Sequence, residues 1–269
     1  MDKIRVTVIG AAGRMGRRLT ALVMASEDMV LTGAVEVAGN PVLGSDAGVV
    51  AGAGVSGVAI TDDLDAALQK SDAVLNFSTA GAVEAAEKAV KANCSIVIGT
   101  TALSEAEKAR LAELAKVGRI VQSPNMSVGV NLLFHLVAEA AKKLDNYDIE
   151  IVEMHHNLKK DAPSGTAVRL GEVAAAARNW NYAEVVRHGR EGLVGARTAG
   201  EIGMHSLRGG DVVGDHTVIF ATGGERVELT HKASSRDTFA GGALRAVRFL
   251  NTAQPGRLYD MQDVLGLRD

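Results

Sequence analysis

Proton-donating and positively charged side chains gather in one short segment, E-I-V-E-M-H-H-N-L-K-K-D-A-P-S-G-T-A-V, between Glu150 and Val168. His155 and Lys159 can each deliver a proton to a reacting group, and a histidine titrates near neutral pH. The Pro-Ser-Gly-Thr turn that follows them opens onto a helical pattern, so its backbone N–H groups can bind an anion. The segment therefore predicts proton transfer beside a bound anion.

The alternating pattern over 148–156 predicts a β-strand, in which neighbouring side chains point to opposite faces. One face would carry Ile149, Ile151, Glu153 and His155, and the other Glu150, Val152, Met154 and His156. The two histidines should therefore have different tasks, one facing the reacting ligand and the other contacting its rim. A zinc site is disfavoured, because there is neither a third ligand at suitable spacing nor an H-x-x-x-H motif.

A second anion site is predicted where Ser164, Gly165 and Thr166 lead into a helix, with Lys159 just before them. It would hold a carboxylate or phosphate of a small substrate. Lys159 and Lys160 alone would suggest a solvated charge pair, but the turn and helix that follow them weigh against that alternative. Further along, H-K-A-S-S-R-D-T-F supplies Arg236. The guanidinium group of arginine fits a carboxylate well. The same residues would also be expected in a surface cluster that caps a helix.

The first anion site is predicted at the N-terminus, where a strand over 4–9 runs into G-A-A-G-R-M-G and then a helix. Strand, glycine turn and helix in this order can bind a pyrophosphate, although glycine turns also occur for steric reasons. Glu36 ends a second strand about 20 residues after Gly16, where a ribose-binding carboxylate belongs, unless it is a solvated surface residue. Val37 offers no cation to a 2′-phosphate, which favours NADH, although Arg14 and Arg17 could compensate.

Strands and helices alternate through the first half. Buried-type runs over 73–77, 95–99 and 119–122 are separated by helical patterns over 82–92 and 104–116. Ser104 and Glu107 have the spacing of a capping box. The alternation predicts an α/β fold, with an N-terminal Rossmann-type doubly wound parallel sheet. The strands end at N-F-S-T, G-T-T and S-P-N-M, which should face the cofactor, while 38–60 reads as a loop or short hairpin.

The second half has a different pattern, which predicts a C-terminal α+β domain with a mixed sheet. A helix over 127–144 is followed by β-rich runs at 148–156, 201–207, 215–221 and 226–231, and a last helix over 238–250. We expect a dinucleotide-binding domain of residues 1–126, completed by 237–269, and a substrate-binding and oligomerisation domain of residues 127–236. Ligands are expected in the cleft between two such domains. His135, in the middle of a helix, is expected to pack.

Composition narrows the function class. The 269 residues are 47% hydrophobic and 23% charged, with a net charge of −3 and only 3% aromatic residues, which argues against nucleic-acid and anionic-membrane partners. One cysteine rules out an internal disulfide and a cysteine-based zinc site, and Cys94 is expected to pack beside a strand. The chain opens directly on a strand pattern, so we expect a cytoplasmic protein.

Several of these motifs together resemble one family, the 4-hydroxy-tetrahydrodipicolinate reductases, also called dihydrodipicolinate reductases. They are G-A-A-G-R-M-G, V-I-G-T-T, S-V-G-V-N, E-M-H-H-N-L-K-K-D-A-P-S-G-T-A, G-D-H-T-V and H-K-A-S-S-R-D-T-F-A-G-G-A. The resemblance runs from the first strand to M-Q-D-V-L-G-L near the C-terminus. The block around the two histidines is highly specific, and the glycine turn is much less so.

The resemblance implies reduction of a cyclic dicarboxylate with NADH and/or NADPH in lysine and diaminopimelate biosynthesis, by a homotetramer joined through the sheets of the second domain. It implies His155 and Lys159 as catalytic residues. The implied substrate-binding residues are His156, Lys159, Ser164, Gly165, Thr166 and Arg236. The implied cofactor-binding residues are Gly10, Ala11, Ala12, Gly13, Arg14, Met15, Glu36, Phe77, Gly99, Thr100, Thr101, Ser123, Pro124, Asn125 and Met126. The sequence departs from the family pattern at two positions. Val37 replaces an arginine that some members use for the 2′-phosphate, which argues against a preference for NADPH, and Asn76 replaces a frequent aspartate, which affects finer contacts to the cofactor.

Two other functions would fit parts of the sequence. A semialdehyde dehydrogenase shares the two-domain plan, but it needs a nucleophilic cysteine, and Cys94 is badly placed for that role. A non-catalytic dinucleotide sensor would use the glycine turn but would have no use for the histidine–lysine segment.

Overall fold

The computed structural model describes residues 2–101 and 103–268 and divides into two compact units. The first unit comprises Met1–Val128 and Arg236–Asp269, and the second comprises Gly129–Ser235. Each unit has its own hydrophobic core, so each is described by itself.

The first unit is built on a six-stranded parallel sheet with the strand order β3-β2-β1-β4-β5-β6. Its strands are β1 (Ile4–Ile9), β2 (Met29–Val35), β3 (Ile60–Thr61), β4 (Ala73–Asn76), β5 (Ser95–Ile98) and β6 (Ile120–Gln122). The order reverses between β1 and β4, the position where open parallel sheets bind ligands. The predicted doubly wound sheet is confirmed.

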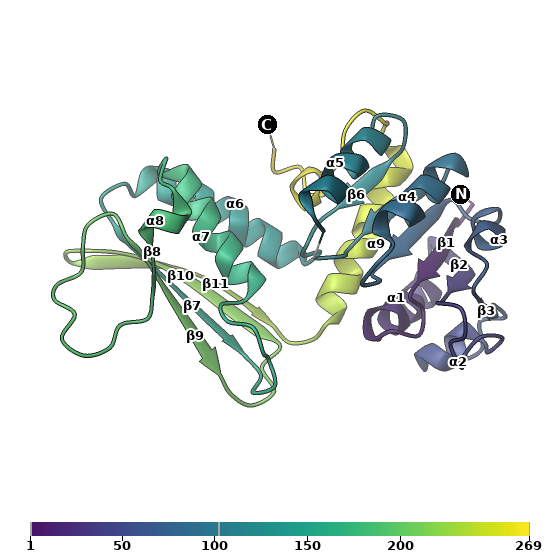
Figure 1. The fold of residues 1–269 in the computed structure, drawn as a ribbon, viewed down its shortest axis with the longest axis horizontal. Helices are drawn as coiled ribbons and strands as arrows, with labels where there is room; N and C mark the ends of the chain where they lie inside the picture. The colour runs from purple at the N-terminus through teal and green to yellow at the C-terminus, as the bar shows by residue number, and fades with distance from the viewer. Residues whose placement is uncertain (1, 102, 269) are drawn as a thin grey trace. The chain divides into compact units, whose positions relative to one another are not determined.

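Helices cover both faces of this sheet (Figure 1). They are α1 (Arg14–Ala25), α2 (Ala47–Ala51), α3 (Leu64–Leu68), α4 (Ala82–Lys91), α5 (Glu105–Leu114), α9 (Asp237–Thr252) and α10 (Met261–Val264). Alternate strand residues feed two cores: Leu75 and Val97 pack with α1 and α9, whereas Val74 and Ile96 pack with α4 and α5. Strands buried on both faces explain why the sequence shows continuous apolar runs there.

Residues 38–60 are more ordered than a plain loop. Asp46 caps the short helix α2 by accepting from the Val49 N–H, and it also accepts from the backbone N–H groups of Ser56 and Gly57. Hydrogen bonds led by the Ser56 N–H hold the pKa of Asp46 below its usual value. A five-residue helix is too short to show helical periodicity, which is why the sequence pattern missed it.

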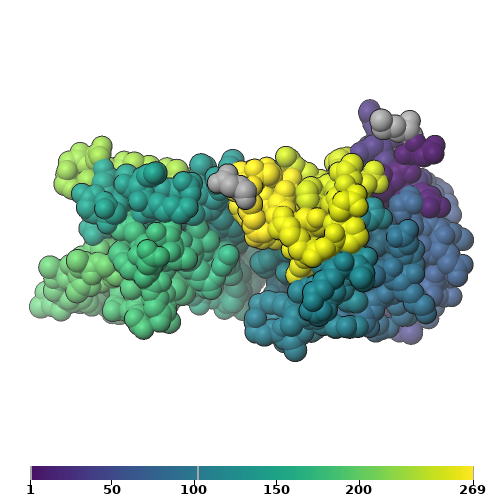
Figure 2. All heavy atoms as spheres, turned by 90° about the horizontal axis from the view of Figure 1, so that it is seen from above, coloured from purple at the N-terminus to yellow at the C-terminus, as the bar shows by residue number. Residues whose placement is uncertain are grey.

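The C-terminal segment completes the first unit along β6. The Gln122 N–H donates to the Tyr259 carbonyl, and the Tyr259 N–H donates to the Ile120 carbonyl. Figure 2 shows this end of the chain on the surface beside the residues near 100–125. These bonds cover an edge strand that would otherwise offer unpaired backbone groups.

The second unit contains a five-stranded mixed sheet with the order β11-β10-β7-β9-β8. Its strands are β7 (Asp148–His155), β8 (Val186–His188), β9 (Ile202–Arg208), β10 (Gly214–Thr222) and β11 (Glu225–Ala233), and its helices are α6 (Val128–Lys143), α7 (Gly165–Ala177) and α8 (Tyr182–Val185). β7 pairs antiparallel with β10 and parallel with β9, so the predicted mixed sheet is confirmed. Side chains of α6 and α7 pack with Ile149, Ile151 and Phe220. Figure 1 shows the sheet and the helices of this unit.

Among the described residues, no helix combines the length and hydrophobicity that a bilayer crossing requires.

Two adjacent glycines of α9 should respond oppositely to alanine. A Cβ at Gly242 would lie 1.7 Å from the Met126 carbonyl oxygen, whereas a Cβ at Gly241 would meet nothing within 4 Å. We expect Gly242→Ala to lower the free energy of unfolding by about 1–3 kcal/mol through overpacking. Gly241→Ala should raise it by up to about 1 kcal/mol, because alanine favours a helix more than glycine does. Urea denaturation of both variants tests this, and equal stability of the two would contradict it.

Candidate active site

The glycine turn between β1 and α1 has the geometry of an anion site. Gly10 has a φ of +73°, and a Cβ at Gly16 would lie 2.0 Å from the Gly10 carbonyl oxygen, so the close approach of these backbones requires glycine. No side chain caps Gly13 at the start of α1. The first turn of this helix can therefore offer its backbone N–H groups to a pyrophosphate.

Glu36 lies against this turn, just after β2. One carboxylate oxygen accepts from the Ala12 N–H at 3.0 Å, and the other accepts from the Val37 N–H at 3.0 Å. Arg17 Nε donates to the Ala12 carbonyl at 2.8 Å, on the same turn. The structure thus brings together the predicted pyrophosphate turn and the predicted ribose-binding carboxylate.

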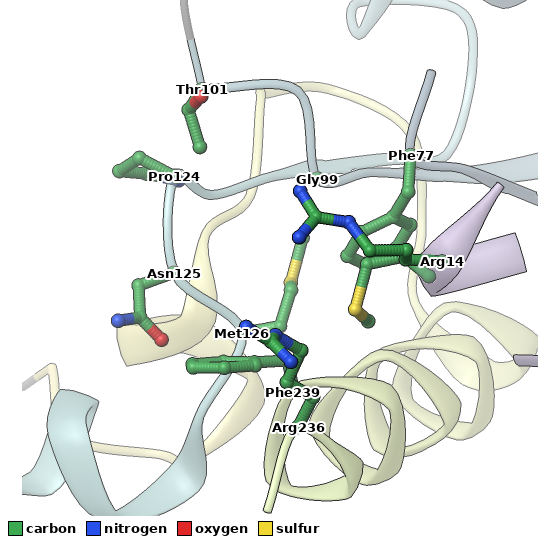
Figure 3. Close-up of a pocket in the computed structure, with 10 residues that line it drawn as sticks. Arg14, Phe77, Gly99, Thr101, Pro124, Asn125, Met126, Arg236 and Phe239 are labelled. Carbon is green, nitrogen blue, oxygen red and sulfur yellow. The ribbon is translucent and has the colours of Figure 1, made fainter. Parts of the chain in front are cut away.

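A cavity of about 310 Å³ lies where β4, β5 and β6 end. It is lined by Arg14, Met15, Phe77, Gly99, Thr101, Pro124, Asn125, Met126, Arg236 and Phe239 (Figure 3). The Phe77 ring packs so tightly over Gly99 that a Cβ there would lie 2.2 Å from it. The first eight of these residues are among those predicted to bind the cofactor, so the cavity fits the apolar and amide parts of a dinucleotide.

Two predicted cofactor residues shape the loops around this cavity. Thr100 and Ser123 are buried; Thr100 Oγ1 donates to the Ser78 carbonyl, and Ser123 Oγ donates to the Asn125 carbonyl, both at 2.8 Å. Asn76 is also buried, and its Oδ1 accepts from the N–H of Ser78 at 3.0 Å. An asparagine at this position therefore keeps the acceptor that an aspartate would supply.

Arg236 lies in the first unit, at the N-cap of α9, and lines this cavity together with Arg14 (Figure 3). Arg236 was predicted to bind the substrate, and in the structure it lines the same cavity as eight of the predicted cofactor residues. Phe239, one helical turn later, was not predicted. The feature of the sequence that could have identified Phe239 is its spacing of three residues from Arg236, because residues three apart lie on the same side of a helix.

In the second unit, the end of β7 carries a carboxylate–imidazole pair whose carboxylate is fully buried. Glu153 is 0% exposed, and one of its oxygens lies 2.6 Å from His155 Nδ1. Arg208 donates to both oxygens at 2.8 and 2.9 Å, and the Ser164 N–H donates at 3.1 Å. Burial alone would raise the pKa of Glu153, but the hydrogen bonds from Arg208 and His155 outweigh it and lower the pKa to about 2. The carboxylate is therefore ionised at neutral pH.

A third histidine packs against this pair. The rings of His155 and His216 meet edge to face with centroids 5.2 Å apart, and His216 Nε2 lies 2.9 Å from Ser164 Oγ. Burial, followed by the nearby His155, lowers the pKa of His216 to about 4, so His216 is neutral at pH 7. A Cβ at Gly214 would lie 3.0 Å from His155 Nε2, so the glycine leaves room beside that nitrogen.

The loop after β7 carries the remaining predicted residues. His156 donates its backbone N–H to the Val212 carbonyl at 2.7 Å, and Lys159 Nζ binds Asp161 at 2.8 Å. Ser164 caps α7 through the Ala167 N–H, so the predicted helix start is where the sequence placed it. Gly165 and Thr166 form the first turn of α7. Arg208 also donates to the Asp161 carbonyl at 2.7 Å, which connects the loop to the carboxylate–imidazole pair.

Glu153, Arg208 and His216 were not among the predicted site residues. The signal for Glu153 was its place on the same strand face as His155. Arg208 had no local signal, because it meets Glu153 only through the pairing of β7 with β9.

Cys94 cannot serve as a catalytic nucleophile. Its side chain is buried, its Sγ lies 3.1 Å from the Ser71 carbonyl oxygen, and burial raises its pKa. This removes the semialdehyde dehydrogenase alternative, which requires an accessible thiolate. Among residues 2–101 and 103–268, no group of three or more His, Cys, Asp or Glu side chains is arranged to hold a metal ion.

A dinucleotide-binding parallel sheet followed by a unit with buried acid–base groups defines the class: a two-unit, nicotinamide-dependent oxidoreductase. Residues 4–126 match the family described as dihydrodipicolinate reductase, N-terminus, and residues 129–265 match dihydrodipicolinate reductase, C-terminus. The chain belongs to the dihydrodipicolinate reductase family, whose members use NADH or NADPH.

Individual relatives agree with this family over the full chain. The chain is 51% identical to the 4-hydroxy-tetrahydrodipicolinate reductase of Citrifermentans bemidjiense, over 98% of this chain and 100% of the relative. It is 52% identical to that of Anaeromyxobacter dehalogenans, over 98% of each. A solved structure of dipicolinate-bound dihydrodipicolinate reductase from Paenisporosarcina sp. TG-14 matches with a TM-score of 0.79 and 26% identity, covering 97% of this chain and 98% of that one.

The buried His216 should make the protein less stable in mild acid. Its folded pKa of about 4 lies below the unfolded value of 6.5, so below pH 6.5 the unfolded chain binds a proton that the folded chain does not. Stability should therefore fall between pH 6.5 and pH 4, by roughly 2 kcal/mol at pH 5 from this residue. In urea unfolding at pH 7.5 and 5, His216→Gln should lose that part of the pH dependence and the exposed control His188→Gln should keep it. An unchanged dependence in His216→Gln would contradict the assignment.

Proposed function

We propose that this chain reduces the cyclic dicarboxylate 4-hydroxy-tetrahydrodipicolinate to tetrahydrodipicolinate and water, using NADH or NADPH, in lysine and diaminopimelate biosynthesis. The observation that carries the proposal is the ionised Glu153 paired with His155, beside the N-terminus of α7, in a chain that also has a dinucleotide turn. A nucleotide sensor would gain nothing from the buried acid–base group.

The residues of the first unit would hold the cofactor, which supplies a hydride when bound. The turn over Gly10, Ala11, Ala12 and Gly13 would bind the pyrophosphate through backbone N–H groups, and Glu36 would accept from the ribose hydroxyls. Arg14 and the residues of the cavity would enclose the nicotinamide end.

The residues around the start of α7 would hold the substrate carboxylates. Gly165 and Thr166 lie in the first helical turn, whose dipole favours an anion, and Lys159 adds a positive charge. Lys159 pairs with Asp161, whose side chain is 66% exposed, so water reaches the carboxylate that a substrate carboxylate would replace. Because the Ser164 hydroxyl is engaged with His216 and Ala167, Ser164 would contribute mainly by fixing the helix start.

His155 would then supply the proton that the reduction requires. Hydride adds to a carbon conjugated with the ring imine, so electron density moves onto the ring and an acid must neutralise it. We place this proton on His155 Nε2, because Nδ1 is bound to Glu153. Lys159 would serve as the second proton donor, and His156 and Arg236 would contact the carboxylates. A homotetramer joined through the sheet of the second unit, and a cytoplasmic location, stay predictions of the family resemblance.

Removing either proton donor should slow the reaction strongly. We expect His155→Ala and Lys159→Ala each to lower kcat by about 10²–10⁴-fold, the usual contribution of a positioned acid or base. Steady-state oxidation of NADH or NADPH in the presence of the cyclic dicarboxylate measures this. The exposed residues His188 and Lys142 supply the matched controls His188→Ala and Lys142→Ala, which should keep wild-type turnover. Wild-type protein that oxidises no nucleotide in this assay would support a sensor instead.

Glu36 and Val37 should set the cofactor preference. A carboxylate at the ribose repels a 2′-phosphate, and valine offers no compensating charge, so kcat/KM with NADH should at least equal that with NADPH. Loss of a charge-assisted hydrogen bond, about 1.5–3 kcal/mol, should lower kcat/KM for NADH in Glu36→Ala by at least tenfold. Val37→Arg should instead raise kcat/KM for NADPH. A wild-type enzyme with a far higher kcat/KM for NADPH would defeat this prediction.

A further inference from the structure

We propose that Glu153 is a positioning residue, held in place by Arg208, that fixes the orientation of His155 and directs the exchanged proton to Nε2. This inference rests on the proposed function, in which His155 is the proton donor.

The geometry leaves the Glu153 carboxylate no freedom to turn. One oxygen is bound by His155 Nδ1 and Arg208 Nη1, and the other by Arg208 Nη2 and the Ser164 N–H. Bidentate binding by an arginine fixes the plane of a carboxylate as well as its position. The imidazole ring that binds this carboxylate is therefore fixed too, and it is only 12% exposed.

The same contact decides which nitrogen of His155 can exchange a proton. An ionised carboxylate accepts but cannot donate, so Nδ1 must carry hydrogen whether the ring is neutral or charged. Nε2 is then the nitrogen that gains and loses a proton, and Gly214 leaves space beside it. The strand geometry gives this result directly, because residues 153 and 155 share one face of β7.

The chemical cost of Glu153 supports a role beyond packing. On the same face of β7, Ile149 and Ile151 fill the core, so an apolar residue at 153 would satisfy packing. A buried carboxylate costs several kcal/mol of desolvation unless it is paired and hydrogen-bonded, and a buried ion pair is commonly no more stable than an apolar replacement. The pairing with Arg208 offsets part of this cost, and the carboxylate also gives the bound His155 ring a defined orientation.

Ionisable groups from three neighbouring elements also lie near the pair. Arg208 comes from β9 and pairs with the Glu153 carboxylate. His216 comes from β10 and is neutral at pH 7. Lys159 and Asp161 come from the loop after β7 and pair with each other.

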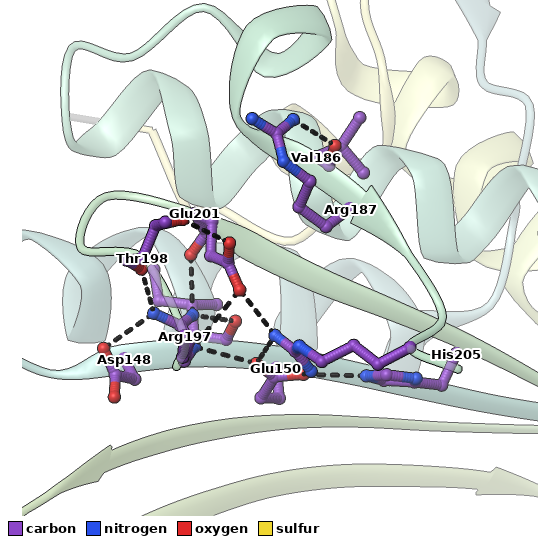
Figure 4. Close-up of polar contacts among 10 residues, drawn as sticks. Asp148, Glu150, Val186, Arg187, Arg197, Thr198, Glu201 and His205 are labelled. Atoms are coloured by element: carbon purple, nitrogen blue, oxygen red, sulfur yellow. Dashed lines mark hydrogen bonds and ion pairs between the residues drawn. The ribbon is translucent and has the colours of Figure 1, made fainter. Parts of the chain in front are cut away.

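A matched control lies on the opposite face of the same strand. Glu150 also binds a histidine and two arginines. His205 Nε2 lies at 2.7 Å and Arg197 Nε at 3.0 Å (Figure 4), and Arg190 Nη2 lies at 2.7 Å. This network ties β7 to β9 and to the segment that carries Arg190 and Arg197, and it contains none of the proposed site residues. Glu150→Gln therefore removes a comparable ion-pair network without touching His155.

The kinetic test compares the pH dependence of kcat in Glu153→Gln and Glu150→Gln. Glu153→Gln should lower kcat by about 10–10³-fold with KM changed less than about threefold. The pH above which kcat falls should also move lower by at least about one unit, because protonated His155 loses an anionic partner and faces an uncompensated Arg208. Glu150→Gln should lose stability but keep the wild-type pH profile. An unshifted profile in Glu153→Gln would overturn the proposal.

A second variant guards against misfolding caused by an unpaired Arg208. Glu153→Leu/Arg208→Met replaces both charges by apolar side chains and removes the acceptor for Nδ1. In ¹⁵N-histidine NMR spectra, neutral His155 should carry its hydrogen on Nδ1 in the wild type and in Glu150→Gln, and should populate both tautomers in the double variant. A wild-type His155 protonated on Nε2, or a double variant that keeps the Nδ1 tautomer, would overturn the proposal.

The failure of this inference can be told apart from failure of the proposed function. If His155→Ala keeps near-wild-type turnover, the proton-donor role of His155 is wrong, whatever the NMR spectra show. If His155→Ala is slow but Glu153→Gln keeps the wild-type rate and pH profile, His155 acts without Glu153 and only this inference fails.

Discussion

The ionised, fully buried Glu153 is the interaction on which the organisation of the second unit depends. It joins β7 to β9 through Arg208, and it joins both strands to the start of α7 through the Ser164 N–H. A buried charge must find donors, and donors on three separate elements can meet it only if those elements take one arrangement. The cluster thus fixes the strand end that carries His155 and the helix start proposed for the substrate.

The first unit depends on a different constraint: at two glycines, the absence of a side chain lets backbone segments approach closely. Gly16 and Gly242 each lie where a Cβ would overlap a backbone carbonyl, of Gly10 and Met126 respectively. The first contact closes the turn at the start of α1, and the second seats α9 beside the loop that follows β6. Backbone approach therefore builds the walls of the cofactor site, whereas a charge cluster builds the acid–base site.

The sequence predicted the repeated, strongly patterned parts of the fold. Apolar runs and helical periodicity located five of the six parallel strands and the long helices, and the Ser104–Glu107 capping box formed as predicted. Short elements such as β3, β8 and α2 were missed, because two to five residues cannot show a period. Of the candidate site, the local motifs were visible, but Arg208 was not: its role requires the register that sets it opposite His155 across β7 and β9. The return of the last helix to the first unit was predicted, but the place of Arg236 in the lining of the cavity was not, because it depends on how the start of α9 packs beside the loop that carries Met126.

A net charge of −3 is compatible with two anionic ligands because the relevant charges are local. Arg14 and Arg236 line the cavity of the first unit, and none of the ten residues that line it is acidic. In the second unit, Glu153 contributes no free negative charge, because Arg208 neutralises it within 3 Å. Salt screens charges beyond about 8 Å at physiological ionic strength, so distant surface carboxylates have little effect on either site. The neutral His216 completes this balance: a second protonated imidazole beside His155 would oppose protonation of the very group that we propose as the proton donor.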